Sequence, residues 1–432
     1  MTATIARVCP GTPPPSWRAL APGSKSITNR ALLLAAVAEG VSTIRRPLIA
    51  EDTEVMLAAL RALGVVITSE SIAEGETSLS VGGLAGPPTG PAELWCGMAG
   101  TVGRFLVPIL AAGVGRFEVD ADQQLRRRPL GPVLDALRRQ GAAITGDAFP
   151  LTVTAAGLDG GQVRVDGSSS SQFISGLLLA APFARAATTL QFEQVVSQPY
   201  LELTFDAMRA FGVEPQVGQR SFTVAPARYR ATEFEIEPDA STASYFLASA
   251  ALTATTVTVP GLSLAQTRQG DAELATLLAR MGCEVTSSGP LRLTGPPRLH
   301  GVHADMSGSS DVFMTLACVA PFADGPTTIE GIAHARVKES DRIAATAENL
   351  ERLGIRVEQG PDYLRIEPGV PRPARLPTYD DHRIAMAFSL IGTRTPVELE
   401  NPGVVAKTFP EFFERWPVTG ARVELCELEG TD

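Results

Sequence analysis

The sequence is poor in cysteine and histidine, the side chains that most often hold transition metals in proteins. Its 432 residues include five cysteines and four histidines. The cysteines are odd in number, widely spaced and form no C-x-x-C pair, which indicates free thiols in a reducing compartment. His300 and His303 form an H-x-x-H pair, but no cysteine or carboxylate cluster accompanies them. We therefore expect no metal site and no cofactor.

An excess of positive charge is also lacking. Acidic residues number 47 against 37 basic ones, so the formal net charge is −10. This balance argues against nucleic acid or an anionic membrane as the main partner. No apolar run approaches the ~18 residues of a membrane span, and the chain opens with neither a signal peptide nor a transit segment. We expect a cytoplasmic protein that acts on small molecules.

Glycine and proline are frequent, with 40 and 33 residues, and the glycines mark an internal repeat. Six times, an amphipathic helix pattern ends at a glycine and continues into a β-branched strand pattern. These glycines are Gly64, Gly141, Gly212, Gly282, Gly354 and, more weakly, Gly420. Their separations are 77, 71, 70, 72 and 66 residues. A period near 70 residues predicts repeated structural units.

A second pattern recurs with the same period: an apolar helix with a polar or small-residue start. The starts lie near Ser26–Arg30, Gly100–Arg104, Ser170–Gln172, Ser241–Ser244, Ser310–Asp311 and Asp381–Arg383. The two patterns together predict six βαβαββ-like units in an α/β (α+β) protein. The chain is too long for one core, so we expect two domains. Helix N-termini attract anions, and several that face one cleft would form an anion receptor.

Basic residues stand close to these helix starts. Those in the motifs are Lys25, Arg30, Arg128, Lys338, Arg342, Arg383 and Lys407. Two phosphorylated carboxylic acids together carry about −5 to −6, a charge that this set can balance. The alternative interpretations are a solvated charge run at 126–128 and an exposed, salt-bridged helix start at 336–342. On a helix, Lys338 and Arg342 would share a face, with Glu339 adjacent.

Eight short motifs occur in a specific order. They are PGSKSITNR (22–30), AGT (99–101), RP (128–129), SSQF (170–173), SQPY (197–200), RVKESDR (336–342), DHR (381–383) and KTFP (407–410). From about residue 20 to residue 415 the chain thereby resembles the 3-phosphoshikimate 1-carboxyvinyltransferases (5-enolpyruvylshikimate-3-phosphate synthases). The resemblance implies two similar globular domains of three units each, with a cleft between them that closes on ligand. Domain 1 would contain residues 1–21 and 238–432, and domain 2 residues 22–237.

The reaction that the resemblance implies is transfer of the enolpyruvyl group of phosphoenolpyruvate to the 5-hydroxyl of shikimate 3-phosphate, in the shikimate pathway. By motif, Asp311 would be the base toward the hydroxyl, Glu339 would exchange a proton with C3, and Lys25 would assist. Shikimate 3-phosphate would contact Lys25, Ser26, Arg30, Ser170, Ser171, Gln172, Ser197, Tyr200, Asp311 and Lys338. Phosphoenolpyruvate would contact Lys25, Gly100, Arg128, Gln172, Arg342, Arg383 and Lys407. The resemblance favours a monomer without a metal or other cofactor.

The sequence departs from this family's pattern at several positions. Met98 and Phe105 stand where many members have Asn and Pro, so the resemblance does not fix sensitivity to the inhibitor glyphosate. His334 replaces the Asn of some members, and the proline-rich segment Gly11–Trp17 is unusual.

Two alternatives remain. UDP-N-acetylglucosamine enolpyruvyl transferases are similar in fold to the family named above, but they typically have Lys-Asn at the position of Lys25-Ser26. They also carry a loop cysteine in the region 120–128, where this chain has none. The other alternative is a non-catalytic paralogue that binds a phosphorylated metabolite; retention of all seven cations, Asp311 and Glu339 argues against it.

Overall fold

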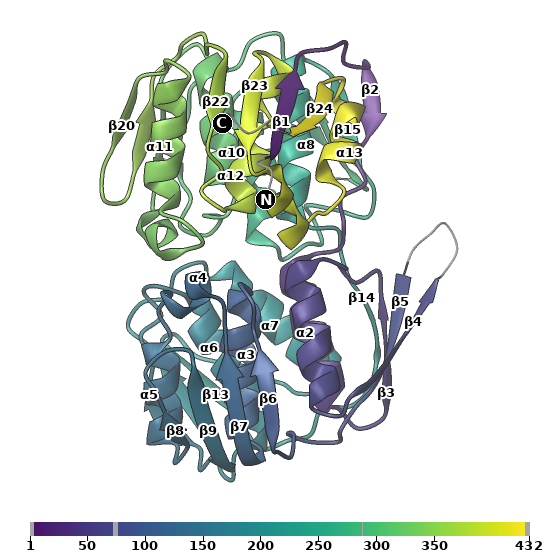
Figure 1. Ribbon diagram of the computed structural model, residues 1–432, viewed down its shortest axis with the longest axis vertical. Coiled ribbons are helices and arrows are strands. Elements are labelled where there is room, and N and C mark those ends of the chain that lie inside the picture. The colour runs from purple at the N-terminus through teal and green to yellow at the C-terminus, as the bar shows by residue number, and fades with distance from the viewer. Residues whose placement is uncertain (1–3, 72–76, 287, 428–432) are drawn as a thin grey trace. The chain divides into compact units, whose positions relative to one another are not determined.

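The chain folds into two compact units, each with its own hydrophobic core. In the computed structural model, which describes residues 4–71, 77–286 and 288–427, unit 1 contains Met1–Pro22 and Pro238–Asp432, and unit 2 contains Gly23–Glu237 (Figure 1). Residues 1–3 and 428–432 of the predicted first domain lie outside the described residues. The chain thus leaves unit 1 at Pro22 and returns to it at Pro238.

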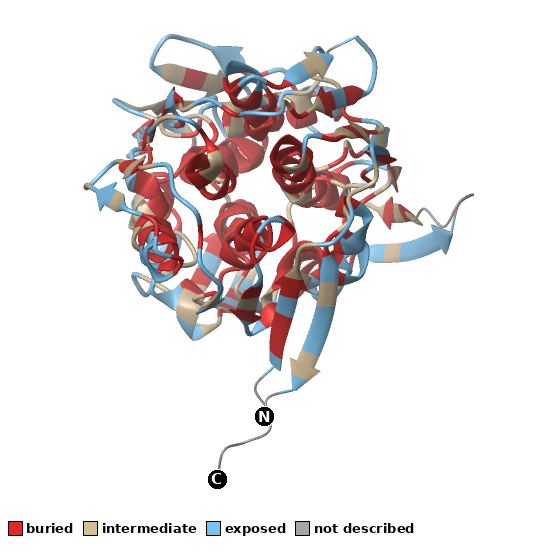
Figure 2. Ribbon diagram, turned by 90° about the horizontal axis from the view of Figure 1, so that it is seen from above, coloured by how far each residue is buried: buried red, intermediate tan, exposed pale blue. Residues whose placement is uncertain are grey.

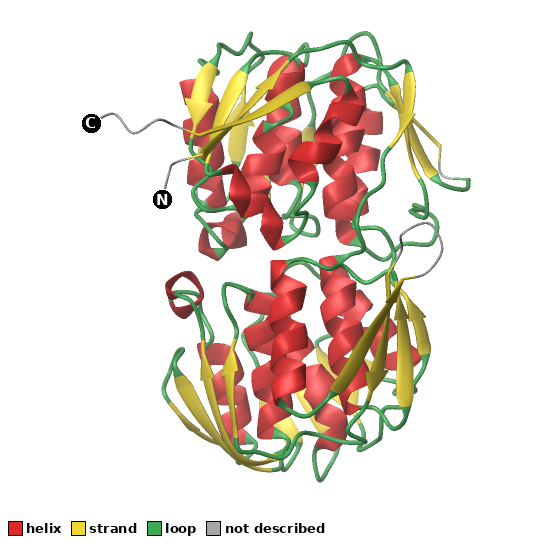
Figure 3. Cartoon of the chain, turned by 45° about the vertical axis from the view of Figure 1, so that its right-hand side comes forward, coloured by secondary structure: helices red, strands yellow, loops and turns green. Residues whose placement is uncertain are grey.

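Helices form the interior of each unit, and sheets lie on its outside (Figure 3). Those of unit 2 are α1 (Lys25–Val37), α2 (Glu51–Ala62), α3 (Gly100–Ala111), α4 (Gln123–Arg126), α5 (Gly131–Arg139), α6 (Ser171–Ala180) and α7 (Pro199–Ala210). Those of unit 1 are α8 (Ala240–Thr253), α9 (Glu273–Arg280), α10 (Phe313–Val319), α11 (Arg342–Arg352), α12 (His382–Phe388) and α13 (Phe412–Arg415). Helices α3, α10 and α12 are buried over their whole length, and α8 is buried except at its last residue, Thr253, which fits the few charged residues in these segments. The interior helices are accordingly drawn mostly as buried in Figure 2.

Six four-stranded sheets repeat one topology. Unit 2 has three of these sheets. In strand order, the first is β14 (Glu233–Glu235), β3 (Val41–Arg45), β5 (Thr77–Gly82) and β4 (Val66–Ser71), and the second is β6 (Ala92–Trp95), β7 (Val114–Asp120), β9 (Leu151–Ala156) and β8 (Ala143–Thr145). The third is β10 (Gly161–Arg164), β11 (Thr188–Gln191), β13 (Ser221–Val224) and β12 (Gln216–Val217). Unit 1 has the other three. In strand order, the first is β2 (Ser16–Arg18), β15 (Thr256–Val259), β17 (Leu291–Thr294) and β16 (Glu284–Thr286), and the second is β18 (His303–Asp305), β19 (Thr327–Glu330), β21 (Leu364–Ile366) and β20 (Val357–Gln359). The third is β22 (Ala374–Leu376), β23 (Val397–Glu400), β1 (Thr4–Cys9) and β24 (Arg422–Glu427). In every sheet the first two strands are parallel and the other neighbours are antiparallel.

Three of the six units are completed by strands that are distant in sequence. Strand β14 pairs with β3, β2 pairs with β15, and β1 pairs with both β23 and β24. Where the chain passes between the units, the backbone N–H of Ser24 donates to Glu237 O at 2.8 Å, and that of Asp239 donates to Pro22 O at 2.8 Å. The prediction of six βαβαββ units, three in each of two similar globes, is confirmed.

The glycines of the repeat end their helices for a common reason. All six have a positive φ, from 81° at Gly354 to 107° at Gly282. A residue with a Cβ is strained in this region, whereas glycine enters it readily and lets the helix turn into the following strand. The recurring glycine was therefore a reliable sequence signal.

Some helix boundaries differ from the prediction. The prediction that Lys338 and Arg342 share a helical face is wrong, because α11 begins only at Arg342. The side chain of Asp341 caps this helix by accepting from Ala344 N at 3.0 Å. Helix α10 begins at Phe313, two residues after the predicted start at 310–311. The last repeat helix is split into α13 and a 3-10 turn, η8 (Trp416–Thr419), which contains Pro417.

No helix among residues 4–71, 77–286 and 288–427 has the length and hydropathy of a transmembrane span.

Candidate active site

Lys25 in unit 2 forms a largely buried ion pair. It is the first residue of α1, and its Nζ lies 2.9 Å from Oδ2 of Asp52, in the first turn of α2. The side chains are 12% and 5% exposed. Asp52 was not predicted as a site residue, since an acidic residue in a first helical turn is ordinary. The structure shows that Asp52 fixes the ammonium group of Lys25.

Arg30, one turn further along α1, is a fully buried cation whose hydrogen-bond acceptors are all neutral. It donates to Thr204 Oγ1 at 2.9 Å, to Tyr200 O at 2.9 Å, to Ser26 O at 2.8 Å and to Ser175 Oγ at 3.3 Å. Its guanidinium also lies over the ring of Phe105, 5.0 Å from the centroid. Burial lowers the pKa of Arg30 to about 10, so it is still charged at neutral pH. A buried charge among neutral groups is costly unless an anion joins it.

Arg104 joins the starts of two helices to the loop that carries Arg128. Its Nη1 donates to Gln172 Oε1 at 2.8 Å and its Nη2 to Pro129 O at 3.1 Å. Gln172, near the start of α6, also donates to Thr101 Oγ1 at 3.4 Å. Sequence reasoning placed Arg104 at a helix start but gave it no role. The structure makes it the residue that holds Gln172 and the 128–129 loop together.

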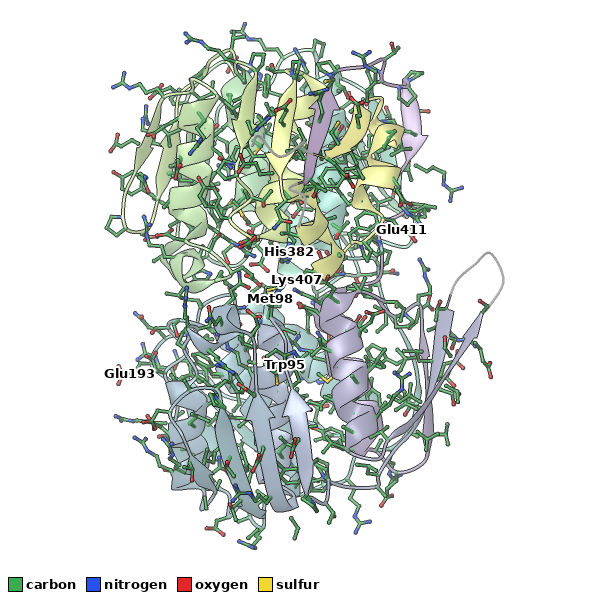
Figure 4. The ribbon with its side chains drawn as sticks, viewed as in Figure 1. Trp95, Met98, Glu193, His382, Lys407 and Glu411 are labelled. Carbon is green, nitrogen blue, oxygen red and sulfur yellow. The ribbon has the colours of Figure 1, made fainter. Side chains whose placement is uncertain are left out.

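Gly100 and Arg128 are in close contact. A Cβ placed on Gly100 would lie 2.8 Å from Nη1 of Arg128, closer than real contacts allow. Gly100 is therefore required for the buried position of this guanidinium against the start of α3. Met98, two residues earlier, is labelled in Figure 4.

The predicted serines lie at bends in the backbone. Ser170 is the N-cap of α6 and accepts from Gln172 N at 3.3 Å, and Ser171 begins the helix. Ser197 has a left-handed backbone with φ of 51°, and its carbonyl accepts from Tyr200 N at 3.1 Å. Ser170, Ser171 and Ser197 are buried. Unit 2 therefore has hydroxyl groups, backbone turns and cations at the ends of α1, α3, α6 and α7.

Arg342 is the centre of the cluster in unit 1. Its guanidinium donates to Asp381 Oδ2 at 2.8 Å, Asp311 Oδ1 at 2.9 Å and Glu339 Oε2 at 2.8 Å. The side chain is only 1% exposed. Burial lowers the pKa of Arg342, but the charges of the three carboxylates outweigh it and raise the pKa above its ordinary value.

Asp311 is surrounded by cations. Its Oδ2 accepts from Arg383 Nη2 at 2.9 Å, and its Oδ1 lies 3.6 Å from Lys338 Nζ in addition to the contact with Arg342. Burial raises the pKa of Asp311, but Arg383, Lys338 and Arg342 outweigh it and hold the pKa well below its usual value. In this arrangement Asp311 is ionised and a weak base.

Asp381 was part of a predicted motif but had no predicted role. It caps α12 by accepting from Arg383 N at 3.0 Å, and it also accepts from Ser340 Oγ at 3.0 Å. The carboxylate thus holds the guanidinium of Arg342 and the backbone at Arg383, the two arginines that contact Asp311. Lys407 is buried at the end of the 3-10 turn η7 (Pro402–Lys407), which packs against α12 (Figure 4).

The two histidines of the H-x-x-H pair have separate partners. His300 Nδ1 lies 2.8 Å from Asp324 Oδ2, and His303 Nε2 lies 3.0 Å from Glu330 Oε2. In the part of the chain that the structure describes, no three His, Cys, Asp or Glu side chains are grouped as metal ligands.

Two globes of three βαβαββ units each, with buried cations at the helix starts, are what the resemblance to the enolpyruvyl transferases implied. The chain belongs to the family of EPSP synthase (3-phosphoshikimate 1-carboxyvinyltransferase), whose model matches residues 19–416. The family recognised from the sequence motifs is therefore confirmed, and with it the assignment as a transferase.

Individual relatives agree. The chain is 41% identical over 406 residues to the 3-phosphoshikimate 1-carboxyvinyltransferase of Nostoc punctiforme, covering 91% of this chain and 94% of the relative. It is 42% identical over 415 residues to 3-phosphoshikimate 1-carboxyvinyltransferase 2 of Halalkalibacterium halodurans, covering 93% and 91%. An EPSP synthase structure from Acinetobacter baumannii has a TM-score of 0.81 at 28% identity and covers 98% of this chain and 100% of that one.

Proposed function

We propose that this chain transfers the enolpyruvyl group of phosphoenolpyruvate to the 5-hydroxyl of shikimate 3-phosphate and releases phosphate. Membership of the EPSP synthase family carries the proposal. The matched segment, residues 19–416, includes every candidate site residue, from Lys25 to Lys407. The buried cations of both units supply the charge that two phosphorylated carboxylic acids require.

Phosphoenolpyruvate is assigned to the arginine-rich groups. The residues proposed to hold it are Lys25, Gly100, Arg128, Gln172, Arg342, Arg383 and Lys407. Arginine suits this ligand because its planar fork of donors matches both carboxylate and phosphate oxygens. The tight contact of Gly100 with Arg128 supports a role in which the position of that guanidinium matters.

Shikimate 3-phosphate is assigned to the hydroxyl-rich groups of unit 2 and to two residues of unit 1. The proposed set is Lys25, Ser26, Arg30, Ser170, Ser171, Gln172, Ser197, Tyr200, Asp311 and Lys338. The burial of Arg30 among neutral acceptors supports this assignment, since a bound anion would supply the missing counter-charge. In unit 1 the cation assigned to shikimate 3-phosphate is Lys338, whose Nζ lies 3.6 Å from Oδ1 of Asp311.

The reaction proceeds by addition and then elimination. In the addition, the 5-hydroxyl oxygen bonds to C2 of phosphoenolpyruvate, and Asp311 takes up the hydroxyl proton with help from Lys25. Glu339 first takes up a proton from solvent and then gives it to C3. In the elimination, C3 returns a proton to Glu339 while the bond from C2 to the phosphate oxygen breaks, and the proton taken from the hydroxyl leaves with the phosphate, which restores the Asp311 carboxylate. Each proton transfer needs a side chain within hydrogen-bond reach of the atom that gains or loses the proton.

The donor itself makes Asp311 a better base. Arg342 and Arg383 both donate to this carboxylate and neutralise it. Both arginines are also proposed to bind phosphoenolpyruvate, whose negative charge would oppose theirs. A nearby anion raises the pKa of a carboxyl group, so Asp311 becomes more basic when the donor is bound.

The compact units are proposed to act as the two domains, 1–21 with 238–432 and 22–237. We also propose that the protein works as a cytoplasmic monomer without a cofactor. The five cysteines support a reducing compartment, since all are free thiols.

Release of inorganic phosphate tests the function. Purified protein in EDTA is mixed with phosphoenolpyruvate and with either shikimate 3-phosphate or UDP-N-acetylglucosamine. Release with shikimate 3-phosphate alone is expected. Release with the nucleotide sugar would identify the alternative transferase, and release with neither acceptor would favour a binding protein.

A further inference from the structure

The turn that carries Asp311 is anchored through three consecutive side chains. Ser309 Oγ donates to Glu273 Oε2 at 3.0 Å, at the start of α9. Ser310 Oγ lies 2.7 Å from His334 Nε2, and Asp311 itself accepts from Arg342 at 2.9 Å. Ser309 and Ser310 are buried, so water does not compete for their hydrogen bonds. The position of Asp311 is thus set by partners on three other segments.

His334 is the anchor that the reaction scheme leaves unused. It lies in the 3-10 turn η5 (Ala333–Val337) and is 7% exposed. Burial and the nearby charge of Lys338 lower the pKa of His334 to about 4, so the ring is neutral at pH 7. A neutral imidazole can share a hydrogen bond with Ser310 without adding a charge beside Lys338 and Asp311.

The hydrogen bond between His334 and Ser310 connects two segments whose side chains must keep a fixed position relative to each other for the proposed reaction. Turn η5 ends at Val337 and leads directly into Lys338 and Glu339, while Ser310 directly precedes Asp311. One hydrogen bond therefore joins the segment of the proposed hydroxyl base to the segment of the proposed C3 proton donor. Displacement of a reacting group by about 1 Å can lower a rate by about 10²-fold.

We propose that His334 is a positioning residue for enolpyruvyl transfer, which acts through Ser310 to hold the Asp311 carboxylate in place relative to Lys338 and Glu339. This inference rests on the proposed function. His334 does not exchange a proton with substrate in this role. Its contribution is the hydrogen bond between Nε2 and Ser310 Oγ, which are 2.7 Å apart.

Three substitutions separate this role from others. In His334→Leu the hydrogen bond is lost, in His334→Gln the terminal amide can reach the position of Nε2, and His303→Leu is a control at a side chain that is 64% exposed. We expect kcat of His334→Leu to fall at least tenfold, with KM for shikimate 3-phosphate changed less than threefold. We expect His334→Gln to retain at least a third of the wild-type kcat and His303→Leu to match wild type.

Ser310→Ala completes a double-mutant cycle. If both side chains act through one hydrogen bond, the double variant His334→Leu/Ser310→Ala loses no more kcat than the more impaired single variant. Multiplied losses, a Gln variant as poor as Leu, or an unchanged kcat in His334→Leu would each overturn the proposal. A raised KM at constant kcat would overturn it too, because that pattern indicates a substrate contact.

Two outcomes must be kept apart. If wild-type protein releases no phosphate with shikimate 3-phosphate, the proposed function fails before His334 is tested. If wild type is active and the variants behave otherwise than stated, only the role of His334 fails. If His334→Leu does not fold, His334→Gln and Ser310→Ala give the same test: the first is expected to keep at least a third of the wild-type kcat, and the second to lose at least tenfold.

Discussion

Arg342 and Asp381 form a two-point ion pair in the core of unit 1. The Nε atom donates to Oδ2 at 2.8 Å and Nη2 to Oδ1 at 3.2 Å. Arg342 begins α11 of the fifth βαβαββ unit, and Asp381 caps α12 of the sixth. Asp381 also accepts from Arg383 N and Ser340 Oγ, so it holds the guanidinium of Arg342 and the start of the helix that carries Arg383, and both arginines neutralise Asp311.

Removal of Asp381 is predicted to be strongly destabilising. Asp381→Ala leaves a buried guanidinium short of one carboxylate and deletes the cap of α12, and loss of one partner of a buried pair costs about 3–5 kcal/mol. Urea unfolding of the variant measures this. The control Glu348→Ala breaks an exposed i,i+4 pair with Arg352, 2.7 Å long, and is expected to cost about 0.5 kcal/mol. Equal losses in the two variants would contradict the central role of Asp381.

Asp271 gives a prediction about pH. It is buried in the 3-10 turn η3 (Gly270–Ala272) and accepts a hydrogen bond from Ser241 Oγ. Burial, followed by the negative charge of Asp311, raises the pKa of Asp271 to about 6. The unfolded value is about 3.9, so between pH 4 and 6 the folded protein binds more protons and loses stability as pH rises.

Substitution of Asp271 should remove this penalty. The variant Asp271→Asn keeps an acceptor for Ser241 but cannot ionise. We expect its melting temperature to exceed that of wild type at pH 8, and the difference to shrink or reverse at pH 4. Differential scanning calorimetry at both pH values measures it, with the exposed Glu351→Gln as control. A difference that does not depend on pH would show that Asp271 does not titrate in this range.

How much of this could be predicted from sequence depends on the range of each interaction. The six glycines and most of the helix starts were predictable, because a positive φ and a helix N-terminus are set by a few neighbouring residues. The roles of Asp52, Arg104 and Asp381 were not, because their partners Lys25, Gln172 and Arg342 lie 27, 68 and 39 residues away. Motif resemblance selected the cations, whereas only the fold shows which carboxylates hold them.

Gly100 is predicted to control the position of the Arg128 guanidinium. In Gly100→Ala the new Cβ would lie 2.8 Å from Nη1 of Arg128, so the guanidinium must move. We expect KM for phosphoenolpyruvate to rise about tenfold or more while the melting temperature stays near that of wild type.

Steady-state kinetics with varied donor measures the effect. The matched control is Gly131→Ala, at the start of α5, where an added Cβ meets no atom within 4 Å. An unchanged donor KM in Gly100→Ala would remove Arg128 from the proposed donor site.

Substitution of Glu339 tests the proposed proton transfer to and from C3 of phosphoenolpyruvate. Its Oε2 accepts from Arg342 Nη2 at 2.8 Å, and a glutamine can keep that bond through its amide oxygen but cannot carry the proton. We expect Glu339→Gln to lower kcat about 10²–10⁴-fold, the usual contribution of a general acid–base group, with both KM values within threefold of wild type.

Deuterium labelling identifies the atom at which Glu339 acts. During turnover in D₂O, C3 of the donor gains a deuteron in the addition and loses a proton or a deuteron in the elimination. Wild type is therefore expected to place deuterium in the vinyl group of the product and in recovered phosphoenolpyruvate, as mass spectrometry can measure. In Glu339→Gln the exchange should fall together with kcat. If the variant is slow but exchanges deuterium at the wild-type rate, another group protonates C3, and the role of Glu339 is confined to holding Arg342.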